Sequence, residues 1–75
     1  MKRYSIVANF TKEEEYYTLK KRAFGLTTDV LEASMYSELS DAESIMNKLN
    51  DNYRKLFETD NNWSIKELNI TVNEL

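Results

Sequence analysis

A carboxylate pair is the main catalytic option in this sequence, because histidine and cysteine are both absent. Their absence excludes Ser/His and Cys/His nucleophilic sites, thiolate zinc sites and thiol redox chemistry. Glu13, Glu14 and Glu15 are consecutive, so their side chains point in different directions and cannot meet on one reacting atom. We interpret this run as a solvent-exposed turn. The sequence therefore predicts a protein that is not an enzyme and that has no small-molecule substrate.

Ion and nucleotide sites are also poorly supported by the residue spacing. Asp60, Asn62 and Ser64 match the first three ligand positions of a calcium-binding loop. However, Ile65 stands where the loop needs glycine and Thr71 where it needs a bidentate glutamate. The chain has one glycine, which is too few for a phosphate-binding loop. We predict no metal site and no cofactor.

The charge of the chain is distributed unevenly. Residues 1–25 contain six basic and three acidic side chains, whereas residues 26–75 contain four basic and ten acidic ones. The net charge of −3 is the sum of these two halves. This asymmetry predicts surfaces of opposite sign, which favour attraction between copies or to a basic partner.

Alternating apolar and polar residues predict strands in the first part of the chain. Residues 4–10 alternate in types that favour a half-buried strand, and residues 16–24 resume the pattern after the polar segment 11–15. Gly25 can adopt a positive φ and predicts a second turn.

Residues 30–36 fit two patterns. Period-two alternation predicts a third strand, whereas helical spacing allows one long helix over residues 29–58. Ser40 and Glu43 match a capping box, which would be wasted in the middle of a helix. We therefore favour a strand at 30–36 followed by an amphipathic helix over 41–57.

Residues 63–72 predict the last strand. Trp63 begins it as a core residue, and its alternation slips between Ile65 and Leu68, which predicts a bulge at Lys66-Glu67. The predicted fold is a single α+β domain over residues 1–75, with β-β-β-α-β order. It is an antiparallel meander with one helix packed on one face. A right-handed crossover would make the last strand parallel to strand one or three.

Two surfaces could bind a partner. The sheet face away from the helix mixes aromatic, apolar and basic residues, which suits a dimer interface or, less well in an acidic chain, a platform for single-stranded nucleic acid. Its predicted members are Val7, Tyr16, Lys20, Arg22, Phe24, Val30 and Tyr36. The outer face of the helix is acidic and could imitate a nucleic-acid backbone. Its predicted members are Glu43, Asn47 and Asp51.

The run Met35-Tyr36-Ser37, the capped helix and Trp63-Ser64-Ile65 give the chain a resemblance to small phage or mobile-element proteins of low-GC Gram-positive bacteria. The resemblance implies an accessory protein that binds host or phage macromolecules, a class that includes inhibitors of host defence nucleases. No apolar run suits a signal peptide or a bilayer span, so we expect a cytoplasmic protein without membrane contact.

From these observations we expect a non-enzymatic protein-binding module that forms a homodimer through a sheet face or edge, or binds another protein. The first alternative is an acidic inhibitor of a nucleic-acid-handling host protein. The second is a weak binder of single-stranded nucleic acid.

Overall fold

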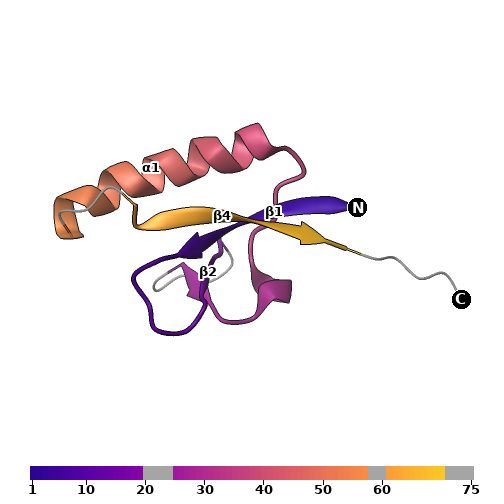
Figure 1. Ribbon diagram of the computed structural model, residues 1–75, viewed down its shortest axis with the longest axis horizontal. Helices are drawn as coiled ribbons and strands as arrows, with labels where there is room; N and C mark the ends of the chain where they lie inside the picture. The colour runs from indigo at the N-terminus through magenta and orange to yellow at the C-terminus, as the bar shows by residue number, and fades with distance from the viewer. Residues whose placement is uncertain (20–24, 58–60, 71–75) are drawn as a thin grey trace, which may run out of the picture.

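The fold is α+β, with a four-stranded antiparallel sheet and one helix packed on it. The computed structural model describes residues 1–19, 25–57 and 61–70. The strands follow the order β3-β2-β1-β4 across the sheet, and Figure 1 shows α1 lying along the β1–β4 pair. The elements in chain order are β1 (Lys2–Ala8), β2 (Tyr16–Tyr17), β3 (Leu26–Thr27), the 3₁₀ turn η1 (Val30–Glu32), α1 (Leu39–Phe57) and β4 (Trp63–Asn69).

The two long strands, β1 and β4, form the centre of the structure. They pair antiparallel without interruption from Lys2 opposite Asn69 to Ala8 opposite Trp63. The predicted parallel orientation of the last strand is wrong, because β4 begins beside the end of α1 and runs back along the helix (Figure 1). The predicted bulge at Lys66-Glu67 is also wrong, since every residue of β4 has one partner in register.

The core between the sheet and α1 is aromatic and aliphatic. Ile6, Ala8 and Trp63 are buried there, and Ala42 of the helix is fully buried. The residues that pack against this cluster are Tyr17, Leu26, Tyr36, Ile45, Met46, Leu49 and Tyr53. The sequence correctly predicted the amphipathic helix and the core position of Trp63.

A second, smaller core lies on the opposite face of the sheet. Val7 and Tyr16 are buried there against Ala33, with Val30 packed beside them. Residues 29–34, which we call the covering segment, therefore cover Val7 and Tyr16 on the face that the sequence predicted to be open. In Figure 1 this segment, with its short 3₁₀ turn, lies on the side of the sheet away from α1.

The predicted third strand at 30–36 is wrong. The Asp29 carboxylate accepts a hydrogen bond from the Leu31 amide at 2.9 Å and caps η1, so the chain turns where alternation predicted an extended strand. The third strand is β3, and Tyr36 contributes only an isolated antiparallel bridge to Tyr4.

The alternative helix over residues 29–58 is wrong as well, because α1 begins at Leu39. The Glu38 carbonyl accepts the hydrogen bond of the Ala42 amide at 3.3 Å, which places the helix start before Ser40 and contradicts the predicted capping box. Gly25 has a φ of 63°, as the predicted turn requires. Neither described helix has the combination of length and apolar character needed to traverse a bilayer.

Candidate functional site

The predicted interaction face does not form one exposed surface. Val7 and Tyr16 are buried beneath the covering segment, to which the half-buried Val30 itself belongs. Tyr36 packs on the other side of the sheet, in the core next to α1. The remaining members, Lys20, Arg22 and Phe24, lie outside the described residues.

The predicted acidic face is exposed and continuous. Glu43, Asn47 and Asp51 are each four residues apart on α1, so they lie along one side of the helix. Glu43 and Asn47 also line a groove between α1 and β4. The acidic face therefore borders the outer strand of the sheet.

The outer edge of β4 can be read from the hydrogen bonds at its two ends. Met1 and Ile70 exchange backbone hydrogen bonds of 3.1 and 2.8 Å, and the Asn9 amide donates to the Asn62 carbonyl at 2.8 Å. Bonded and non-bonded pairs alternate along an antiparallel ladder, so every second residue of β4 turns its backbone groups away from β1. These outward residues are Trp63, Ile65, Glu67 and Asn69.

The side chain of Asn50 occupies the first of these outward positions. Its Oδ1 accepts from the Trp63 amide at 2.8 Å, and its Nδ2 donates to the Trp63 carbonyl at 3.3 Å. The amide group thus reproduces the pairing of a neighbouring strand at one residue. Ile65, Glu67 and Asn69 remain, and no described residue pairs with their backbone groups. We call these three residues the open edge.

The groove beside the open edge has a volume of about 650 Å³. Its apolar lining comes from both the sheet and the helix, and the charged side chains among its described lining residues are both acidic. The apolar residues are Tyr4, Leu39, Met46, Trp63 and Ile65; the acidic ones are Glu43 and Glu67; Asn47, Asn50, Asn61 and Ser64 complete it.

The two acidic residues of the groove differ in their partners. Glu67 forms an ion pair with Lys2 at 3.3 Å, in which both side chains are about half exposed or more. Glu43 forms no ion pair with any described residue. The groove therefore presents one carboxylate that no described residue pairs with and one carboxylate already shared with a lysine.

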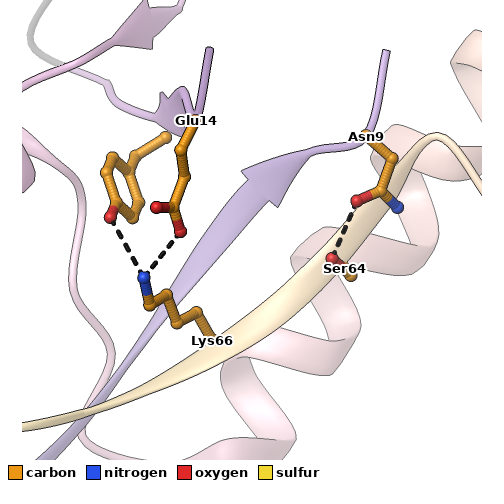
Figure 2. Close-up of polar contacts among 5 residues, drawn as sticks. Asn9, Glu14, Ser64 and Lys66 are labelled. Carbon is orange, nitrogen blue, oxygen red and sulfur yellow. Dashed lines mark hydrogen bonds and ion pairs between the residues drawn. The ribbon is translucent and has the colours of Figure 1, made fainter. Parts of the chain in front are cut away.

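A polar contact on the opposite face of β4 attaches this strand to the loop before β2. The Lys66 ammonium donates to Glu14 Oε1 at 2.6 Å and lies 3.5 Å from the Tyr16 hydroxyl (Figure 2). The hydrogen bond from Lys66 lowers the pKa of Glu14, and the same bond raises the pKa of Lys66. Figure 2 also shows Ser64 donating to Asn9 at 3.1 Å, a second link between β4 and the chain after β1.

The start of β4 is held by aromatic packing. Trp63 makes edge contacts with Phe10, Tyr17 and Tyr53, with ring centroids 5.3 to 5.9 Å apart. Such pairs add to the free energy gained by burial alone. The position of the open edge relative to α1 is therefore fixed by the core.

Known proteins add no assignment: no family model, curated protein or solved structure matches the chain. Within the described part of the chain, no three His, Cys, Asp or Glu side chains are grouped as a metal site would require. The most developed surface feature is therefore the open edge with its groove.

The sequence predicted binding through a sheet face or edge, but it did not predict that the open edge would be on β4 or that Asn50 would pair with its first outward residue. A signal was present in the apolar residues of 63–70, whose change of parity between Ile65 and Leu68 was interpreted as a bulge. In the structure the strand is regular, and Ile65 and Leu68 face opposite sides of the sheet, where each is half-buried. Assigning Ile65 and Leu68 to opposite faces of the sheet would have predicted a regular strand without a bulge.

Proposed function

We propose that this protein is a protein-binding module that accepts an extended segment of a partner as an additional strand beside β4. The observation that carries the proposal is the open edge, three successive outward positions on a regular strand whose amide and carbonyl groups pair with no described residue. Strand addition satisfies such groups, while pockets next to the edge select alternate side chains of the incoming segment.

Two features that commonly block outer strands, proline and a bulge, are missing from β4. The chain contains no proline, and the register of β4 contains no bulge. Asn50 covers only the first outward position, so the pairing of an incoming strand would begin at Ile65. The groove lies directly beside that position.

Selection from a displayed library of random linear peptides tests this proposal. We expect enriched peptides to protect the amides of Ile65, Glu67 and Asn69 from hydrogen exchange. Glu67→Pro should abolish binding, because it removes the central donor of the open edge without removing a bond to β1. Glu67→Ala is the matched control, since it removes the same carboxylate and keeps the donor. Enriched peptides that bind Glu67→Pro as well as the wild type would contradict strand addition.

The exposed acidic face supports a second candidate function, inhibition of a nucleic-acid-handling protein by charge mimicry. Its charge is modest, because Asn47 is neutral and Asp51 lies 3.8 Å from Arg54. This candidate predicts capture of basic nucleases that weakens when Glu43→Gln and Asp51→Asn are combined. The phage or mobile-element origin and the cytoplasmic location stay predictions.

A further inference from the structure

We infer that the strand accepted by the open edge comes from another protein and carries a lysine or arginine opposite Glu67, with an apolar residue opposite Ile65. This inference rests on the proposed function. It names the chemistry of the partner, which the open backbone groups alone do not specify.

The geometry of strand pairing places these two partner residues in the groove. Residues directly opposite each other in a β ladder project to the same face of the sheet. Ile65 and Glu67 both line the groove, which lies on the α1 side. A partner residue opposite either of them therefore projects toward α1.

Along the axis of α1, Glu43 lies close to the level of the partner residue opposite Glu67. It precedes Asn50 by seven residues, or about 10 Å along the helix, and Lys66 follows Trp63 by three residues, or about 10 Å along the strand. Asn50 contacts Trp63, and the helix and β4 run in opposite directions (Figure 1). Glu43 is thus level with the part of β4 between Ile65 and Glu67.

The charges of Glu43 and Glu67 favour a basic partner residue opposite Glu67. Glu43 is free of ion pairs with described residues, and Lys2 shares the charge of Glu67 at 3.3 Å. A basic side chain opposite Glu67 would meet both carboxylates, and its aliphatic stem would lie along the apolar lining formed by Tyr4 and Met46. An acidic side chain there would be repelled by two like charges.

The apolar requirement follows from the neighbouring position. Ile65 is half-buried, and Met46 of the helix lines the groove with it. An apolar residue opposite Ile65 would remove surface of both side chains from water. A second copy of β4 offers the wrong charge, because its own outward residues are Ile65, Glu67 and Asn69.

A pair of synthetic peptides tests the inference directly. The probes are Thr-Val-Thr-Lys-Thr-Val-Thr and the same peptide with glutamate in place of lysine, both with blocked ends. Their pattern reads the same in either direction, so valine can lie opposite Ile65 in either strand orientation. Binding is followed by amide chemical shifts of the labelled protein.

We expect the lysine peptide to bind the wild type about tenfold more tightly than the glutamate peptide, since two partly exposed carboxylates change from attraction to repulsion. Glu43→Lys should reverse much of this preference. Glu32→Lys is the matched control, because Glu32 is an exposed acid of η1 on the far side of the sheet, and it should leave the preference unchanged.

The outcomes separate the inference from the proposed function. Equal binding of both peptides, with shifts at the open edge, would overturn the charge inference and leave strand addition intact. Binding of neither peptide at millimolar concentration, or shifts confined to other surfaces, would overturn both. A lysine peptide methylated on its backbone nitrogens should not bind, because it cannot donate to the open edge.

Discussion

Asn50 pairs with Trp63, the outward residue that precedes the open edge, and removing its side chain should destabilise the protein. Asn50→Ala would leave the amide and carbonyl of the buried Trp63 without partners. We expect a loss of about 1–3 kcal/mol in the free energy of unfolding, the usual penalty for unpaired buried polar groups. Urea denaturation measures it. Asn47→Ala is the control, because Asn47 is an exposed asparagine of the same helix and the change in helix propensity is the same.

An equal effect of the two substitutions would show that the Asn50 hydrogen bonds do not stabilise β4. Asn50→Asp adds a second test, because a carboxylate can accept from the Trp63 amide but cannot donate to the carbonyl. It should recover part of the stability lost in Asn50→Ala.

The ion pair between Glu14 and Lys66 predicts a pH dependence of stability. The Lys66 hydrogen bond lowers the pKa of Glu14, so the bond contributes fully above the usual value of 4.5 and is lost as pH falls through the lowered value in the folded protein. The pKa of Lys66 is raised, so its contribution is full below 10.5 and is lost as pH rises through the raised value.

At pH values between the lowered pKa of Glu14 and the raised pKa of Lys66, Glu14→Gln should therefore destabilise the protein. In strong acid it should have little effect. Urea denaturation at neutral and acid pH measures this difference, with Glu13→Gln as the control. Lys66→Met should return the carboxyl pKa of Glu14 toward its usual value in a carbon-13 titration. An unchanged titration would show that the pair does not form in solution.

At the scale of elements, the covering segment shows where sequence reasoning failed. The alternation of Val30, Glu32 and their neighbours is compatible with a strand, but Asp29 captures the Leu31 amide and starts a turn instead. A short polar residue before an alternating run is a local signal for such a turn. The turn places Ala33 on the sheet face that had been predicted to be open, so the predicted interaction face does not form there.

The elements that were predicted well have strong local patterns. The helix has an apolar stripe that packs on the sheet, and β1 has residue types that suit a buried strand. The site was predicted only in part: Glu43, Asn47 and Asp51 are exposed, and Glu43 and Asn47 line the groove beside β4, but the open edge depends on which strands become neighbours. Strand order is set by packing between distant segments, and no short window of sequence contains it.

Overpacking the second core tests whether the covering segment closes that face. Ala33 is 5% exposed and packs with Val7 and Tyr16. Ala33→Leu should reduce the free energy of unfolding by about 1–3 kcal/mol, because the added atoms have no space in a packed contact. Thermal or urea denaturation measures the loss, and Glu32→Leu at an exposed neighbouring position is the control. A neutral effect of Ala33→Leu would indicate that the face is open in solution.

At the scale of the whole molecule, α1 covers one sheet face and the covering segment covers part of the other, which leaves the edge of β4 as the surface best suited to a partner. The covered parts of the two faces are not free to bind a partner, but the outer strand still has backbone groups to offer. Glu43 and Asn47 of the acidic face line the groove beside that same edge. Backbone pairing and charge are therefore available to one incoming segment at one place.

The same arrangement should oppose pairing of β4 with a second copy. The antiparallel register that uses all three open-edge residues is centred on Glu67, so it places two glutamates directly opposite each other, and like charges there destabilise a strand pair. We expect Glu67→Thr, which removes the charge and favours strands, to self-associate more strongly than the wild type. Light scattering over a range of concentrations measures this, with Glu32→Thr as the control. A wild type that already dimerises through β4 would contradict the charge argument and support the homodimer predicted from the sequence.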